Sequence, residues 1–269
     1  MANMNKKIAR FLMDRQPETP CLVVDLDIVA DNYQTLRSTI PLAEIFYAVK
    51  ANPAPEILCV LRDLGSSFDG ASIYEIESCL EVGVSPEKLS FGSTIKKSRD
   101  IAAAHAHGVR LFAFDSAGEL DKIAKEAPGA RVYCRILMEG HGADWPLSDK
   151  FGCDVEMAAE LLIEASRRGL DPYGVSFHVG SQQRDIDQWD IALGRTAMVF
   201  SALNAAGIEL KMINIGGGFP ARYRHDVEQP KVYANGIMTA MTKNFGNRLP
   251  EMIVEPAPQR FVCPSRALM

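Results

Sequence analysis

Several polar residues that could take part in catalysis stand where short apolar runs of the sequence end. Lys50 ends the run that begins at Ile45, and Asp69 ends a second run, with Glu75 six residues further on. Later runs end in, or lead directly into, Arg135, His178, Ser181, Gly216, Gly217, Gly218 and Glu255. If the runs are parallel strands, their carboxyl ends meet at one edge, and these residues lie together.

Lys50 has two interpretations. A lysine is costly to bury as a cation, so a lone lysine after a strand usually lies at the rim with its ammonium in solvent. The alternative is an amine that forms a Schiff base with a carbonyl compound. Asp69 and Glu75 would then hold and tune that amine, although each acid alone is more often a helix cap or a solvated charge.

The second motif is glycine-rich. The stretch GSQQ after His178 and the triplet at residues 216–218 both follow apolar runs, and each could form a nest of backbone N–H groups for a phosphate. A sharp turn between strand and helix explains the triplet equally well, and a lone histidine on a strand is usually a core residue. Phe219 and Pro220 follow the triplet at once, so it is not a dinucleotide-binding motif.

Taken together, these residues are more specific than any one of them. A lysine, a phosphate cradle, a histidine and an acid on separate strand ends suit pyridoxal phosphate. The lysine would hold the aldehyde, the glycines would hold the phosphate, and the acid would keep the pyridine nitrogen protonated.

The elements that must position these residues alternate regularly. Eight apolar runs alternate with segments of helical spacing, and they lie at residues 45–49, 67–69, 89–91, 111–114, 132–137, 174–178, 212–215 and 252–254. This alternation predicts a parallel sheet, and eight units in this length favour a closed (β/α)8 barrel over an open sheet. We also expect helix caps at residues 115–116 and Asp154, glycines at helix ends, and a further strand at residues 21–25, outside the barrel.

Composition narrows the function further. The 269 residues carry a net charge of -5 without a basic run, which argues against nucleic acid and anionic membranes as partners. No apolar stretch nears the roughly 20 residues that span a bilayer, and we expect a cytoplasmic protein. The six cysteines lack metal-binding spacing, so we expect reduced thiols and no metal site.

Five motifs then occur in order between residues 46 and 256: FYAVKANP, FDGAS, FHVGSQ, GGGFP and VEP. Together they resemble the barrel domain of the fold-type III pyridoxal-phosphate decarboxylases, over nearly nine-tenths of the chain. The stretches WPLSDKFG and GVSFHVGS favour the bacterial ornithine/lysine decarboxylase branch over the diaminopimelate and arginine branches. The resemblance implies a (β/α)8 barrel of the alanine racemase-like type.

The resemblance also implies a role for each site residue. Lys50 would bind the cofactor aldehyde, with Asp69 and Glu75 on the lysine side and Arg135 below the ring near those acids. His178 would stack on the pyridine face, and Glu255 would pair with the pyridinium nitrogen. Ser181 and Gly218 would bind the phosphate, within the cradle that we expect Gly216, Gly217 and Gly218 to form. The implied reaction is decarboxylation of ornithine or lysine to putrescine or cadaverine, in polyamine biosynthesis.

The sequence departs from the family after Pro256. The family pattern Glu-Pro-Gly-Arg is replaced by EPAPQR, which places Arg260 five residues beyond Glu255 and puts its phosphate role in doubt. We expect the family's second, β-rich domain to be missing. We therefore divide the chain into an N-terminal helical extension (1–19), a cofactor-binding barrel (20–256) and a divergent tail (257–269). The tail can be read as a frameshift product, a deliberate truncation or a natural short form.

Three functions follow from these features. The first is an amino-acid decarboxylase, with a small amino acid as substrate, that forms a homodimer or pairs with a full-length relative. The second is a single-barrel protein that binds pyridoxal phosphate without catalysis. The third is a regulatory pseudo-enzyme that pairs with a full-length decarboxylase, and the retained Lys50 argues against it.

Overall fold

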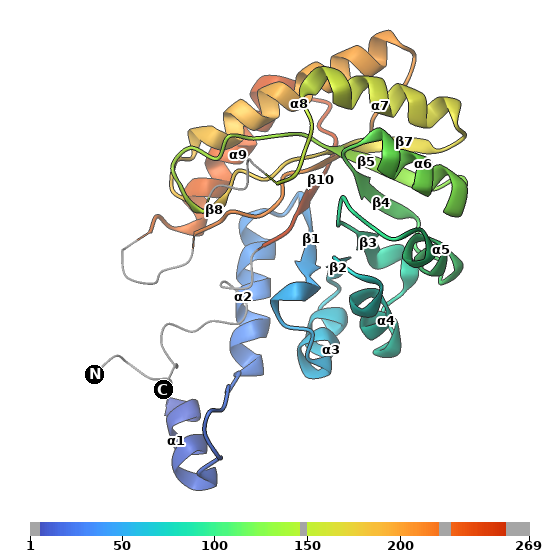
Figure 1. The fold of residues 1–269 in the computed structure, drawn as a ribbon. Helices are drawn as coiled ribbons and strands as arrows, with labels where there is room; N and C mark the ends of the chain where they lie inside the picture. The colour runs from blue at the N-terminus through green and yellow to red at the C-terminus, as the bar shows by residue number, and fades with distance from the viewer. Residues whose placement is uncertain (1–5, 146–149, 221–226, 257–269) are drawn as a thin grey trace.

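The computed structural model describes residues 6–145, 150–220 and 227–256. Its centre is a closed barrel of eight parallel strands in the order β1-β10-β9-β7-β5-β4-β3-β2 (Figure 1). The strands are β1 (Ala43–Ala48), β2 (Ser67–Gly70), β3 (Leu89–Phe91), β4 (Leu111–Phe114), β5 (Arg131–Arg135), β7 (Asp171–Ser176), β9 (Met212–Asn214) and β10 (Glu251–Val254). The predicted barrel and all eight predicted strands are confirmed.

Helices surround the barrel in a closed ring, in which each helix packs against the next. In ring order they are α2 (Leu26–Thr39), α3 (Pro55–Asp63), α4 (Ile73–Glu81), α5 (Ser98–Ala106), α6 (Ala117–Glu126), α7 (Val155–Arg167), α8 (Asp187–Ala205) and α9 (Pro230–Phe245). The place between α9 and α3 is taken by α2, which precedes the first strand. The apolar core lies in two parts, one between strands and helices and one inside the barrel.

Local sequence explains where these helices begin and end. The side chain of Asp154 accepts a hydrogen bond from the N–H of Met157 at 2.7 Å, which confirms the predicted cap. At residues 115–116, Ser116 occupies the N-cap position without a side-chain bond. The predicted glycine ends are confirmed, because a positive φ is found at Gly65, Gly83, Gly108, Gly169 and Gly207.

The extra strand predicted at residues 21–25 is wrong. This segment forms no strand, because within the described residues no other strand lies beside it. Instead it leads from α1 (Lys6–Arg15) into α2, and Asp25 caps α2 by accepting from the N–H of Asp27. In Figure 1 the helix α1 lies apart from the barrel. The division at residues 19 and 256 stays a prediction, and the tail lies outside the described residues.

Four short elements, two strands and two 3-10 turns, were not predicted. Strands β6 (Ala143–Trp145) and β8 (Ser181–Gln183) pair antiparallel in a sheet of their own, after the carboxyl ends of β5 and β7. Two 3-10 turns, η1 (Val49–Ala51) and η2 (Pro86–Lys88), flank β1 and β3.

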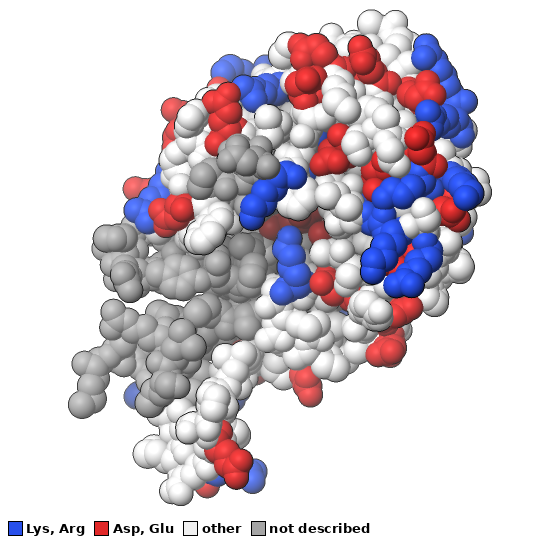
Figure 2. Space-filling view, viewed as in Figure 1, with Lys and Arg blue, Asp and Glu red and all other residues white. Residues whose placement is uncertain are grey.

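Among the described helices, none has the length and apolar character needed to cross a bilayer. On the face drawn in Figure 2, acidic and basic side chains are interspersed.

A buried ion pair fixes the loop between β3 and α5. The Lys96 side chain is fully buried, and its Nζ lies 2.9 Å from the Glu119 carboxylate of α6. The same ammonium donates to the carbonyls of Ser93 at 2.8 Å and Ala113 at 2.5 Å. Burial lowers the pKa of Lys96 to about 8, although the Glu119 charge opposes that shift.

This pKa predicts a dependence of stability on pH. Between about pH 8 and pH 10.5 the unfolded chain binds more protons at Lys96 than the folded chain, so Lys96 makes the free energy of unfolding rise with pH. We expect Lys96→Met to lose this contribution, so that its free energy of unfolding rises less steeply with pH than that of the wild type. Urea unfolding at several pH values measures this slope. Glu119 keeps its ion pair with Lys122 at 2.5 Å in that variant.

The matched control is Lys125→Met, since Lys125 is an exposed lysine on α6, the helix that carries Glu119. It should keep the slope of the wild type. Equal slopes in the wild type and Lys96→Met would contradict a buried Lys96 with a lowered pKa.

Candidate active site

The structure brings the predicted residues together at the carboxyl end of the barrel. Lys50 lies in η1 directly after β1, and Asp69 lies in β2. Arg135 ends β5, Ser181 begins β8 after β7, and Glu255 follows β10. Electrostatic contacts join them across the barrel, because Asp69 faces Lys50, Glu75 and Glu255, and Arg135 faces Asp69 and Glu255.

Lys50 itself is exposed at this end of the barrel. Within the described residues its ammonium makes no hydrogen bond or ion pair. The backbone that carries it is fixed, since Val49 is buried and the Tyr47 hydroxyl donates to the carbonyl of Asn52 at 3.2 Å. The site therefore presents a primary amine on a rigid turn, free to react with a carbonyl compound.

Asp69 is a buried carboxyl on the barrel interior. Burial raises the pKa of Asp69 well above its ordinary value, and the Glu255 carboxylate raises it further. Ser90 on β3 donates its hydroxyl to Asp69, which acts in the opposite direction. The carboxyl packs directly on Gly92, where a Cβ would overlap it.

Glu75 acts as a helix cap. Its carboxylate accepts from the backbone N–H of Ala71 at 2.7 Å, and Ser72 accepts from the N–H of Glu75 at 3.4 Å. This is the cap interpretation that the sequence left open for this acid. The carboxylate still faces Asp69 electrostatically, so it contributes negative charge to the site.

Glu255 is positioned by a residue that the sequence reasoning missed. Asn214, at the end of β9, donates its amide to the Glu255 carboxylate at 2.5 Å. The amide oxygen of Asn214 also accepts from the N–H of Gly216 at 2.9 Å. One buried side chain thus fixes both an acid and the start of the glycine triplet.

Arg135 lies beside this acid in the interior. Burial lowers the pKa of Arg135, while the charges of Glu255 and Asp115 raise it. Its guanidinium lies 5.2 Å from the centre of the Phe151 ring. Because a guanidinium stays protonated far above neutral pH, it supplies one fixed positive charge among these acids.

The glycine loop (residues 216–218) is shaped by close backbone contacts. A Cβ on Gly217 would lie 2.5 Å from the Glu255 carbonyl oxygen, and one on Gly218 would lie 2.6 Å from the Gly180 carbonyl oxygen. Gly216 and Gly218 also have positive φ. Within the described chain, the N–H groups of Gly217 and Gly218 and the hydroxyl of Ser181 have no hydrogen-bond partner.

His178 is held in one tautomer at this loop. Its Nδ1 accepts from the N–H of Gly180 at 3.0 Å, which places the ring proton on Nε2. Burial, helped by the charges of Arg135 and Lys50, lowers the pKa of His178 to about 3. The imidazole is therefore neutral at physiological pH, and it offers a flat ring and one N–H donor.

A second missed residue, Gln183, joins the surrounding loops. Its amide donates to the carbonyls of His141 and Val179, both at 2.8 Å, and its amide oxygen accepts from the N–H of Asp185. Its own N–H donates to the Gly218 carbonyl at 2.8 Å. This fully buried side chain thus supports the glycine loop from behind. Arg260 lies outside the described residues.

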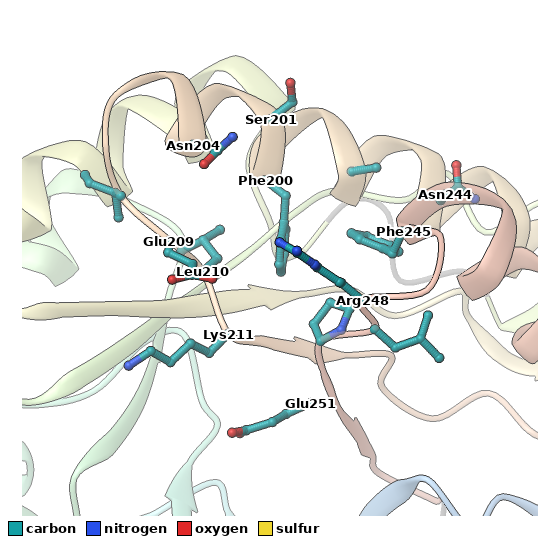
Figure 3. Close-up of a pocket in the computed structure, with 14 residues that line it drawn as sticks. Phe200, Ser201, Asn204, Glu209, Leu210, Lys211, Asn244, Phe245, Arg248 and Glu251 are labelled. Atoms are coloured by element: carbon teal, nitrogen blue, oxygen red, sulfur yellow. The ribbon is translucent and has the colours of Figure 1, made fainter.

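A separate pocket of about 570 Å³ lies at the opposite end of the barrel (Figure 3). It is lined by the carboxyl-terminal parts of α8 and α9, by residues 208–211 before β9, and by residues 248–251, of which Glu251 is the first residue of β10. Because strand direction places Lys50 at the other end, this pocket is not part of the candidate active site.

Comparison with known families agrees with this geometry. Residues 26–262 match the family model described as pyridoxal-dependent decarboxylase, pyridoxal binding domain. The chain therefore belongs to this family, as its motifs indicated.

Individual relatives agree. A lysine/ornithine decarboxylase of Selenomonas ruminantium is 39% identical over 260 residues, which are 97% of this chain and 65% of the relative. The crystal structure of SrLDC in complex with PLP and cadaverine gives a TM-score of 0.86 at 36% identity, covering 96% of this chain and 65% of that one. The crystal structure of the Paramecium bursaria Chlorella virus arginine decarboxylase gives a TM-score of 0.88 at 28% identity, and the match covers 96% of this chain and 69% of that one. The chain thus spans about two thirds of the length of these relatives.

The described residues fit pyridoxal phosphate. The free amine of Lys50 suits its aldehyde, and the unpaired donors of Gly217, Gly218 and Ser181 suit a phosphate. The carboxylate of Glu255, held by Asn214, suits the ring nitrogen.

Gly217 allows a direct test of the close packing. Its φ is not positive, so Gly217→Ala adds a methyl group without backbone strain but in contact with the Glu255 carbonyl. We expect a loss of about 1–3 kcal/mol in the free energy of unfolding, as in other overpacked sites. The control is Gly118→Ala on the exposed side of α6, where a Cβ meets no atom within 4 Å. Equal effects of the two substitutions would contradict the tight approach of the loop to β10.

Proposed function

We propose that this chain binds pyridoxal phosphate at the carboxyl end of its barrel and decarboxylates a basic amino acid, lysine or ornithine. The observation that carries the proposal is the free amine of Lys50 opposite a loop with unpaired phosphate donors. Similarity to the lysine/ornithine decarboxylase supports the substrate class.

Each residue has a role in this proposal. Lys50 would hold the cofactor through its aldehyde, and the donors of Ser181, Gly217 and Gly218 would bind the phosphate. Glu255 would accept a hydrogen bond from the ring nitrogen, because Asn214 already fixes its carboxylate. Gly216 would provide the turn that brings these groups together.

The remaining residues set charge and shape. His178 stays neutral, so its ring can lie against the pyridine without adding positive charge. Arg135 offsets the negative charges of Asp69 and Glu255, and Glu75 holds the turn beside Asp69. Pyridoxal phosphate, when bound, supplies an aldehyde for amines and a ring that accepts the electron pair left when carbon dioxide departs.

The test compares Lys50→Ala with the control variant Lys97→Ala. Lys97 is an exposed lysine at the same end of the barrel. With pyridoxal phosphate we expect the visible absorption of a Schiff base in the wild type and Lys97→Ala only. Carbon dioxide release from lysine or ornithine should follow the same pattern. A wild type no more active than Lys50→Ala rules out catalysis by this chain, and absorption without release identifies a non-catalytic cofactor-binding barrel.

We also propose that the chain pairs with a second copy or a full-length relative. Three large side chains in segments after strand carboxyl ends are exposed, namely Tyr74, Ile95 and Trp145. Light scattering should give the mass of a dimer, alone or after mixing with the full-length relative. A monomer in both would contradict the pairing. The thiols of Cys134 and Cys153 lie 3.6 Å apart in a hydrogen bond and form no disulfide, which supports a reducing compartment such as the cytoplasm.

A further inference from the structure

Tyr133 places a buried hydroxyl inside the barrel without a use in the roles described above. It lies on β5 and packs among Phe46, Leu111 and Met212 in the interior cluster. Its hydroxyl is fully buried and makes no hydrogen bond with the described residues. A buried polar group without a partner is rare and costs free energy, so this hydroxyl calls for an explanation.

The hydroxyl of Tyr133 lies near three possible acceptors. The carboxylates of Asp69 and Glu255 and the hydroxyl of Ser90 lie close enough to influence it, as does the guanidinium of Arg135, which can only donate. Burial raises the pKa of Tyr133 well above its ordinary value, and the two carboxylates raise it further. The phenol therefore keeps its proton and remains a hydrogen-bond donor next to the two carboxyl groups.

Ser90 lies between this donor and Asp69. Its side chain is fully buried on β3, and its hydroxyl donates to Asp69 on the neighbouring strand, with which it is in register. A hydroxyl has one proton and two lone pairs. Because the proton of Ser90 is given to Asp69, its lone pairs remain free to accept from Tyr133.

We propose that Tyr133 is a positioning residue, whose hydroxyl donates to Ser90 so that Ser90 and Tyr133 together hold Asp69 as a carboxylate beside Lys50. The inference rests on the proposed function, because Lys50 is the amine that uses this charge. The chain of hydrogen bonds crosses β5, β3 and β2 beneath the site, and polarised chains of this kind strengthen each member.

Charge balance explains why Asp69 needs this support. Glu255 and Glu75 face Asp69 and disfavour its ionisation, as does its burial. Lys50 and the donor Ser90 favour ionisation. An ionised Asp69 in turn stabilises positive charge at Lys50 Nζ, whether on the amine or on its Schiff base.

The first experiment measures the pH at which the Schiff base between Lys50 and pyridoxal phosphate loses its proton, read from its visible absorption. We expect Tyr133→Phe and Ser90→Ala each to lower this pH by at least roughly half a unit, because each removes support for the anion that stabilises the cation. The double variant should match Ser90→Ala alone, since the effect of Tyr133 passes through Ser90.

The control is Tyr173→Phe, which removes a tyrosine hydroxyl that bonds Glu251 at the other end of the barrel. It should leave the titration unchanged. If Tyr133 only fills space, Tyr133→Phe changes the thermal midpoint without moving the titration, and that result overturns the proposal. Additive shifts in the double variant would also overturn it, because they exclude a chain through Ser90.

A second experiment needs no cofactor. The infrared carbonyl band of protonated Asp69, assigned by its loss in Asp69→Asn, should vanish at a higher pH in Tyr133→Phe than in the wild type. If the band vanishes at the same pH in Tyr133→Phe and in the wild type, the hydrogen bond from Tyr133 through Ser90 to Asp69 is contradicted. A wild type that forms no Schiff base rules out the proposed function instead, while the infrared result still decides the role of Tyr133.

Discussion

The close approach of bare backbone at the glycine loop is the constraint on which the rest of the site depends. Residues 216–218 lie so near the carbonyls of Phe177, Gly180 and Glu255 that a side chain would overlap them. The ends of β7, β9 and β10 can meet only because these positions lack a Cβ. The same contacts leave two N–H groups of the loop without a partner in the described chain, so one feature both closes the barrel mouth and offers donors to a ligand.

Charge balance inside the barrel is the second level of organisation. Two carboxyl groups, Asp69 and Glu255, face each other in a region of low dielectric, where like charges repel strongly. Arg135, Lys50 and the hydroxyl donors offset that repulsion, while His178 stays neutral. Asn214 adds direction, since it fixes one carboxylate without adding charge.

The sequence was enough to predict the barrel but only part of the site. Parallel strands are buried on both faces, so their apolar runs were visible, and glycines marked the helix ends. The residues at the strand ends followed from this topology. Tyr133, Ser90, Asn214 and Gln183 did not, because their partners come from distant parts of the chain. Strands β6 and β8 are too short for periodicity to show, and the apolar segment at residues 21–25 looked like a strand although no described strand pairs with it.

The central claim is that this barrel holds pyridoxal phosphate through Lys50. It is tested most directly by reducing the loaded protein with borohydride, which makes a Schiff base permanent, and mapping the modified peptides by mass spectrometry. The account predicts one pyridoxyl group per chain, on Lys50, at near-stoichiometric cofactor. Label spread over exposed lysines such as Lys97, with none favoured, would contradict it.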